Sequence, residues 1–316
     1  MRVLHWHVHG SWSTAFVQGA ATYLVPVTAD RGPDGRGRAW TYHWPGNAIE
    51  VTPAALATEH VDVVVLQRPH ELDLVEQWLG RRPGCDVPAV YVEHNAPRGD
   101  VPNTRHPMAD RSDIPVVHVT PFNELFWDCG RAPTVVIEHG IVDPGHRYTG
   151  EIPHAGVVIN EPVRRGRVTG TDLMPRFAAV APLDVYGMGV AGLHLDGATT
   201  YDDPPQARMH AEIAQRRAYL HLCRWTSLGL SLIEAMQIGM PVLALATTEA
   251  IAAVPDDAGV LATRVDTLVD AAHWLIEEPE QARLLGARAR QVALARYGLD
   301  RFLADWDRLL EEQTCA

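Results

Sequence analysis

One stretch of the sequence, residues 224–242, carries groups that could bind an anion and a sugar. It reads as a loop containing Gly229, a helix-like run holding Glu234, a Gly-x-Pro turn and an apolar strand. Such a loop leads into a helix N-terminus, whose free N–H groups favour an anion or hydroxyl groups. Glu234 lies one helical turn further on, where it would accept hydrogen bonds from a ribose diol. From spacing alone, a solvated glutamate beside an ordinary loop is the alternative.

A second polar stretch, residues 158–167, brings three arginines together. Arg164, Arg165 and Arg167 follow an apolar strand and precede a helix-like run. Guanidinium groups bind pyrophosphate well because they combine charge with several fixed donors. The chain contains no lysine, so any phosphate site must use arginine or backbone N–H groups. A solvated basic turn remains the alternative.

Polar residues also follow apolar strands in the first half of the chain. His94 and Asn95 come directly after such a run, where a neutral imidazole would hydrogen-bond a substrate hydroxyl. A histidine that simply packs at a strand end is the alternative. Arg68 and His70 follow another strand and should line the same edge of the sheet.

The first strand leads into Gly10 and Ser11, whose N–H groups could cap a helix or approach a phosphate. Before them, His5, His7 and His9 alternate, and in a strand this period places all three on one face. That pattern also holds metals in barrel hydrolases, so a metal hydrolase is a chemical alternative. No matching His or Asp series follows in barrel order, so we expect a structural role for at least two of them.

The elements that must position these residues alternate between strand and helix, which predicts parallel sheets covered by helices. In the first half, strands are expected at 61–66, 89–92, 116–119 and 134–137, and helices at 71–79 and 123–129. In the second half, strands are expected at 155–159, 183–186, 219–222 and 241–246, and helices at 170–179, 206–217 and 230–238. From residue 265 on, the apolar spacing predicts amphipathic helices.

The turn-rich segment 143–153 is the expected linker between two domains. We therefore predict an α/β fold with two doubly wound, Rossmann-like domains facing each other across a cleft. Their bounds are 1–148 and 149–295, and a terminal helix at 296–316 packs back toward the first domain. Ligands in such folds bind at the carboxyl ends of the strands.

Composition narrows the class of protein further. The net charge is −12 and neither half is basic, which disfavours nucleic-acid and anionic-lipid partners. No apolar run approaches the ~20 residues of a membrane span, and no secretory leader is recognisable. The four cysteines have no metal-binding or disulfide spacing, which favours reduced thiols in a cytoplasmic protein. The amino-acid bias suggests a GC-rich, bacterial genome.

The stretch at 224–242 resembles the donor-binding signature of family 4 glycosyltransferases, which have the GT-B fold. The residues that carry the likeness stand in register; they are Gly229, Leu230, Glu234, Ala235, Met236, Gly239, Pro241 and Val242. Glu249 and the run 259–261 follow at the expected distance. Arg165 and Gly166 fall where the family has Lys-Gly, and the run 137–143 resembles the end of the family's first domain.

The resemblance implies roles for these residues. Glu234 would hold the nucleotide ribose, Arg165 would stabilise the leaving diphosphate, and His94 would face the reacting sugar. Two positions depart from the family pattern: Thr226 stands where a glutamate usually contacts the sugar, and Asn160 replaces an arginine. The remaining donor-side residues are Gly10, Ser11, Asn160, Arg164, Gly166, Thr226, Ser227, Leu228, Gly229, Leu230 and Glu249. The acceptor side is expected at Arg68, His70, Asn95 and His139, the last replacing an asparagine.

The activity implied is retaining, metal-independent transfer of a sugar from a nucleoside-diphosphate sugar to an acceptor hydroxyl. No cofactor is needed beyond that nucleotide sugar. The acceptor would be a small molecule, a glycan or a peptide, and a homo-oligomer is compatible with the sequence. The departures at Thr226 and Asn160 leave a second hypothesis open, a non-catalytic nucleotide-sugar-binding or partner subunit. An epimerase or phosphorylase on the same fold is a third.

Overall fold

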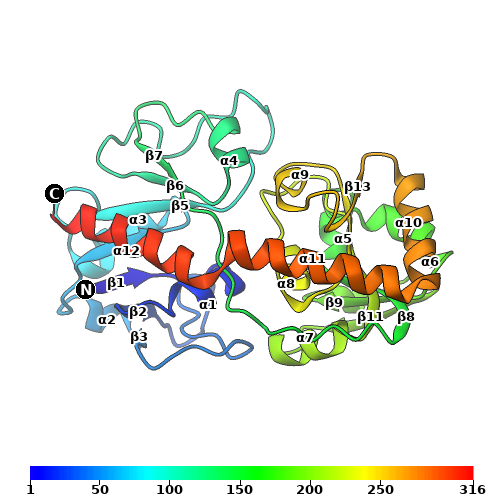
Figure 1. Cartoon of the computed structure of the whole chain (residues 1–316). Helices are drawn as coiled ribbons and strands as arrows, with labels where there is room; N and C mark the ends of the chain where they lie inside the picture. The colour runs from blue at the N-terminus through cyan, green and yellow to red at the C-terminus, as the bar shows by residue number, and fades with distance from the viewer. Residues whose placement is uncertain (316) are drawn as a thin grey trace. The chain divides into compact units, whose positions relative to one another are not determined.

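The computed structural model describes residues 1–315, which divide into two compact α/β units (Figure 1). Unit 1 comprises Met1–Val142 and the last helix, α12 (Leu299–Cys315). Unit 2 comprises Asp143–Gly298. The sequence placed the first boundary at residue 148 and the start of the terminal helix at 296. The structure divides the chain after Val142 and again after Gly298.

Unit 1 is built on a seven-stranded sheet in which all neighbours are parallel. Its order is β3-β2-β1-β4-β5-β6-β7, and β4 is buried along its whole length because both faces are covered. The strands are β1 (Arg2–His5), β2 (Thr22–Pro26), β3 (Ala48–Val51), β4 (Val63–Leu66), β5 (Ala89–Glu93), β6 (Val116–His118) and β7 (Thr134–Val136).

The helices of unit 1 are α1 (Gly10–Phe16), α2 (Pro53–Leu56), α3 (Glu71–Leu79), α4 (Pro121–Phe126) and α12. An aromatic cluster fixes α12 to α1: Trp12 and Phe16 stack at 4.8 Å between ring centroids, and Trp306 meets both rings edge-on. Gly140 lies under the same helix, since a Cβ there would stand 2.2 Å from Phe302. The C-terminal helix therefore belongs to the core of unit 1.

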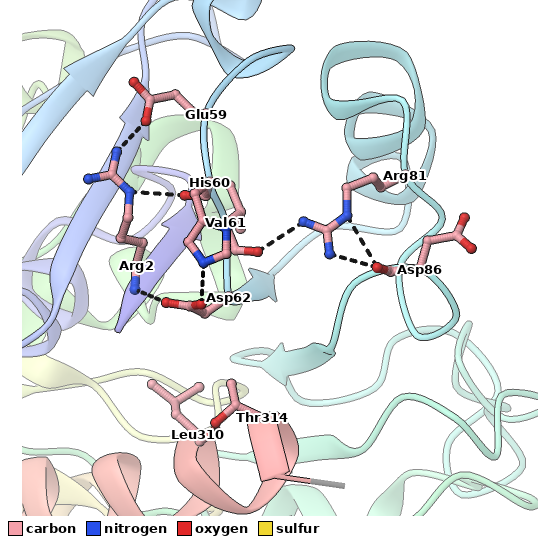
Figure 2. A network of polar contacts seen from close by, with 9 residues as sticks. All are labelled: Arg2, Glu59, His60, Val61, Asp62, Arg81, Asp86, Leu310 and Thr314. Atoms are coloured by element: carbon pink, nitrogen blue, oxygen red, sulfur yellow. Dashed lines mark hydrogen bonds and ion pairs between the residues drawn. The ribbon is translucent and has the colours of Figure 1, made fainter.

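A polar network secures the amino end of this sheet (Figure 2). Arg2 forms an ion pair with Glu59, and its backbone N–H donates to the Asp62 carboxylate at 2.6 Å. Arg81 donates to the carbonyl of Val61 at 3.0 Å. These contacts join the segments that enter β1 and β4, at the edge opposite the strand ends where ligands bind.

Unit 2 contains a six-stranded sheet, again with every neighbouring pair parallel. Its order is β10-β9-β8-β11-β12-β13. The strands are β8 (Ile152–Val158), β9 (Leu183–Gly187), β10 (Ala198–Asp202), β11 (Arg216–His221), β12 (Val242–Leu245) and β13 (Gly259–Ala262). The predicted pair of doubly wound sheets is confirmed. Strands β2, β3, β10 and β13 were not predicted.

The helices of unit 2 are α5 (Pro162–Arg165), α6 (Met174–Ala178), α7 (Gln206–Ile213), α8 (Leu230–Ile238), α9 (Ala250–Ala253), α10 (Val265–Glu277) and α11 (Pro279–Tyr297), with 3₁₀ turns η1 (Gly166–Val168), η2 (Thr171–Leu173) and η3 (Val190–Gly192). Helix α11 approaches the end of α8 so closely that a Cβ on Gly286 would lie 2.0 Å from the carbonyl oxygen of Gly239.

Among residues 1–315, every helix is too short or too polar to cross a membrane. All four cysteines are free thiols, as their spacing predicts.

Two sequence predictions in unit 2 are wrong in detail. The helix expected at 206–217 ends at Ile213, and Arg216 and Arg217 lie in β11. Arg216 is drawn into the sheet by an ion pair between its Nε and Asp184 Oδ2, 2.8 Å long and almost fully buried. The helix expected at 170–179 is instead a 3₁₀ turn followed by the short α6. In the segment 206–217, a tertiary contact therefore outweighs the helical spacing.

Candidate functional site

The loop between β11 and α8 leaves the N-terminus of α8 without a side-chain cap. Gly229 precedes the helix in an extended conformation. A Cβ on Gly229 would stand 2.4 Å from the ring of His221, so the loop needs glycine at this point. Ser227 and Leu228 are buried, whereas Thr226 is partly exposed. Free N–H groups at a helix start attract anions.

Glu234 lies on α8 and is buried. Its carboxylate is held from α7: Gln206 Nε2 donates to Oε1 at 3.0 Å, and His210 Nε2 lies 3.3 Å from Oε2. The two α7 residues are four positions apart, so they share one face of that helix. A carboxylate accepts about four hydrogen bonds, so Glu234 keeps capacity for a diol.

The arginine turn begins with strained backbone. Glu161 has φ 56°, ψ 48°, in the left-handed region, and its carboxylate meets Arg164 Nε at 3.3 Å. Arg167 Nη1 lies 3.4 Å from Asp172. Within residues 1–315, no ion-pair partner lies at Arg165, which is partly buried. Burial raises the pKa of the Cys223 thiol to about 11, and the positive charge of Arg165 opposes that rise.

Arg224 ties this turn to the loop before α8. Its guanidinium binds both carboxylate oxygens of Asp172, at 2.6 and 2.9 Å, and also donates to the carbonyl of Arg167 at 2.7 Å. The backbone N–H of Arg224 donates to the carbonyl of Val168 at 2.8 Å. The free arginine and the free helix N-terminus therefore belong to one fixed assembly within unit 2.

Two other predicted donor residues already have partners. Asn160 Oδ1 accepts the N–H of Met188 at 2.9 Å, so this amide stabilises the turn after β9. Glu249, at the start of α9, is buried and pairs with Arg296 Nη2 at 2.9 Å. Gly166 joins α5 to the 3₁₀ turn η1, and its φ of 44° is a value that glycine tolerates best.

In unit 1, His94 follows β5 and belongs to a cluster of buried rings. The His9 ring packs against it at a tilt, with ring centroids 4.1 Å apart, and Trp12 meets it edge-on at 5.0 Å. Burial, followed by the charges of His9 and His139, holds the pKa of His94 well below its usual range. Burial likewise lowers the pKa of His9 to about 4 and that of His139 to about 3. These imidazoles are therefore neutral near pH 7.

The predicted acceptor-side pair, Arg68 and His70, converges on one carboxylate. Asp34 Oδ1 lies 2.9 Å from Arg68 Nη1 and 2.8 Å from His70 Nε2. Arg68 Nε also donates at 2.6 Å to Glu71, which is fully buried. Burial raises the pKa of Glu71, although Arg68 and the neighbouring backbone N–H groups oppose that rise. Sequence reasoning missed both carboxylates.

The remaining predicted residues of unit 1 play smaller parts. Asn95 is exposed, with its N–H bonded to Glu93 Oε1 at 2.6 Å. Gly10 opens α1 beneath Tyr42, since a Cβ there would lie 2.6 Å from that ring. Ser11 is partly buried in the first turn of α1.

The alternating histidines do not converge as the strand period predicts. Strand β1 ends at His5, which is fully buried and meets Phe16 edge-on at 5.4 Å. His7 Nδ1 instead lies 3.1 Å from the carbonyl oxygen of Gly37, and the His9 ring packs at a tilt against His94. Within residues 1–315, no group of three or more His, Cys, Asp or Glu side chains is arranged to hold a metal ion.

Comparison with known proteins agrees with this architecture. Residues 200–292, which include Glu234, match the family described as glycosyl transferases group 1. No curated protein matches the chain significantly. Sucrose-phosphate synthase from Thermosynechococcus elongatus superposes with a TM-score of 0.73 at 14% identity, covering 99% of this chain and 98% of that one.

Two further solved structures show the same fold. HepE from Anabaena, in complex with UDP, gives a TM-score of 0.69 at 16% identity, covering 99% of this chain and all of that one (100%). TarM from S. aureus, crystallised with UDP among its ligands, gives 0.62 at 15% identity and covers 78% of this chain. The chain spans only 55% of the TarM chain. The predicted GT-B fold is thus confirmed, and the match to glycosyl transferases group 1, which does not distinguish family 4 from family 1, is confined to residues 200–292 of unit 2.

Proposed function

We propose that the chain transfers a sugar from a nucleoside-diphosphate sugar to an acceptor hydroxyl. The observation that carries the proposal is Arg165, a guanidinium without an ion-pair partner in residues 1–315, held in one assembly with the uncapped start of α8. A diphosphate needs such charge and aligned N–H groups. HepE, which shares the fold, is known in complex with UDP and with UDP-glucose, so uridine nucleotides are the first to test.

In this proposal, Glu234 binds the ribose diol while Gln206 holds its carboxylate in place. Arg165 and the N–H groups of α8 stabilise the charge that develops on the departing diphosphate, as preorganised donors do. His94 remains neutral and accepts a hydrogen bond from a hydroxyl of the sugar or of the acceptor. The reaction proceeds with retention through an oxocarbenium-like state, without a metal or a further cofactor.

A thermal-shift screen with UDP, GDP, ADP and TDP, each with and without EDTA, tests the first step. A ligand at 100 times its Kd stabilises the folded protein by about 2.7 kcal/mol, which such a screen detects. The sugar conjugates of the nucleotide that binds are then offered with mixed acceptors. The anomeric configuration of the product, read by NMR, decides between retention and inversion. The proposal requires nucleotide stabilisation that survives EDTA, and turnover of at least one donor.

A second candidate is a nucleotide-sugar-binding subunit without turnover. Asn160 and Glu249 favour it, because both predicted donor contacts are committed within the protein, to Met188 and Arg296. The same screen separates the two candidates. Binding with neither transfer nor donor hydrolysis, across all acceptors, supports the second.

A further inference from the structure

Gln67 connects three segments of unit 1 at the carboxyl ends of their strands. It follows β4, it is buried, and its side chain lies between the loop after β1 and the loop after β5. Its Nε2 is 2.7 Å from the carbonyl oxygen of Trp6, and its Oε1 is 3.0 Å from Nε2 of His94. A buried amide with one partner on each side has a defined orientation.

The chemistry of these partners settles that orientation. The carbonyl of Trp6 can only accept a hydrogen bond, so the NH₂ group of Gln67 must face it. Gln67 Oε1 therefore faces His94, and because this oxygen can only accept, Nε2 of His94 must carry the proton. Neutral imidazole has a single N–H, so Nδ1 of His94 is left as an acceptor.

We infer that Gln67 is a positioning residue that holds His94 as the Nε2–H tautomer and thereby presents Nδ1 as a fixed acceptor for a substrate hydroxyl. The inference rests on the proposed function, in which His94 meets a hydroxyl of the sugar or acceptor. Among the described residues, Nδ1 of His94 has no hydrogen-bond partner. Unlike the fully buried unpartnered atoms, it keeps some solvent-accessible surface. It is therefore available to a ligand.

The surroundings keep both side chains in place. The backbone N–H of Gln67 donates at 2.6 Å to Glu71 Oε2, and Glu71 itself is fully buried at the start of α3. The His94 ring contacts both the tilted His9 ring and, edge-on, the Trp12 ring. Local hydrogen bonds and ring packing therefore fix the tautomer and the direction in which Nδ1 points.

The charged and titratable neighbours favour the neutral form. His9 precedes α1 and His139 follows β7, and both lower the pKa of His94 after burial itself. Arg68 acts in the same direction on His9, and Arg301 of α12 acts so on His139. With the imidazole neutral, the choice between its two tautomers is the variable that Gln67 controls.

The test reads the tautomer directly. In protein with ¹⁵N-labelled histidine, long-range ¹H–¹⁵N correlation spectra distinguish the protonated nitrogen from the bare one, and the His94→Gln spectrum assigns the signal. We expect Nε2 protonated and Nδ1 bare at pH 7. In Gln67→Met the acceptor is gone, and we expect a mixture of tautomers. In Gln67→Glu the acceptor remains, so Nε2 stays protonated and the pKa of His94 rises.

Gln237→Met is the matched control. Gln237 is also fully buried and donates to a single carbonyl, that of Tyr297 at 3.2 Å, but it lies in unit 2. Its loss should leave the His94 signals unchanged. A bare Nε2 in the wild-type protein overturns the inference, and so does a tautomer that is unaltered in Gln67→Met.

Kinetics test the consequence for the reaction. Gln67→Met should lower kcat for transfer about tenfold while UDP affinity stays unchanged, and Gln67→Glu should recover part of that loss. An unaltered kcat in Gln67→Met would overturn the positioning role. A wild-type protein that turns over no donor overturns the proposed function alone, because the NMR measurement of the tautomer needs no turnover.

Discussion

Arg224 and Asp172 form a two-point ion pair, with Nη1 2.6 Å from Oδ1 and Nη2 2.9 Å from Oδ2. The guanidinium of Arg224 holds the pKa of Asp172 below its usual range. Parallel bonds of this kind fix direction as well as distance. The pair therefore sets how the arginine turn stands relative to the loop that begins α8, and with it the position of Arg165.

Replacing Arg224 with leucine should weaken UDP binding but change the free energy of unfolding little. Both partners are partly exposed, with 24% and 38% of the side-chain surface accessible, and such pairs contribute about 0–1 kcal/mol to folding. UDP affinity should fall roughly tenfold, because binding must then order the phosphate site. We expect that ordering to cost about 1.4 kcal/mol of binding free energy. Calorimetric titration and urea unfolding measure the two effects. The control is Arg288→Leu, which breaks an exposed pair with Asp257 in unit 2; equal affinity in the two variants would count against the coupling.

Arg165 and Arg164 are adjacent and provide a matched comparison. Arg164 is exposed and pairs with Glu161, whereas Arg165 has no ion-pair partner within residues 1–315. A hydrogen bond to a charged group is worth about 1.5–3 kcal/mol, so Arg165→Ala should weaken UDP binding roughly 10- to 150-fold. Arg164→Ala should change it less than about threefold. Titration of both variants with UDP and with uridine decides the matter: uridine binding should be unaffected by either change.

Glu234→Gln tests the ribose contact with little change of volume. The carboxylate is buried and already bonded to Gln206, so the amide can keep that side of the site filled. It loses one acceptor oxygen and the negative charge, and nucleotide affinity should fall by about 2 kcal/mol, roughly 30-fold. A 2′,3′-dideoxy nucleotide should bind both proteins equally weakly. Discrimination between ribose and dideoxyribose that survives in Glu234→Gln would show that another group reads the diol.

The sequence predicted two parallel sheets, most of their strands and the segments at the carboxyl ends of those strands, because buried parallel strands and glycine loops leave local patterns. Glu234 and Arg165 were predicted as donor-site residues in this way. The contacts of Gln206 and His210 with Glu234 in unit 2, and those of Asp34 with Arg68 and His70 in unit 1, were not, because a helix face and a loop supply them and only the fold determines their positions. Gln67 follows β4 directly, but the role inferred for it depends on the Trp6 carbonyl, which no sequence pattern reveals.

Arg216 was placed in the wrong element, and the reason yields a further prediction. Its guanidinium binds Asp184 at 2.8 Å and lies 5.7 Å from the ring centroid of Tyr186, with 8% of the side-chain surface exposed. Removing one partner of a buried pair costs about 3–5 kcal/mol, so Arg216→Met should lower the free energy of unfolding by that amount in urea titrations. Arg216→Met combined with Asp184→Leu should recover most of the loss. A single variant as stable as the wild type would contradict the buried pair.

Acid should begin to destabilise the protein at pH values well above the pKa of its carboxylates, because several buried histidines stay neutral in the folded state. His5 is the sharpest case: burial, followed by the charge of His7, lowers its pKa to about 3, and neither ring nitrogen has a hydrogen-bond partner within residues 1–315. In the unfolded chain the same imidazole takes up a proton below about pH 6.5. The stability due to the neutral ring is thus complete above pH 6.5 and is lost progressively as the pH falls toward 3.

His5→Leu should therefore flatten the pH dependence. Between pH 7.5 and 5 the wild-type protein should lose about 2 kcal/mol more of its free energy of unfolding than His5→Leu does. At pH 7.5 the variant should be at least as stable, because it buries no unpartnered nitrogen. Urea unfolding at both pH values measures the difference. His43 is exposed, so His43→Gln should follow the wild-type curve; if His5→Leu follows it as well, His5 does not carry the acid sensitivity.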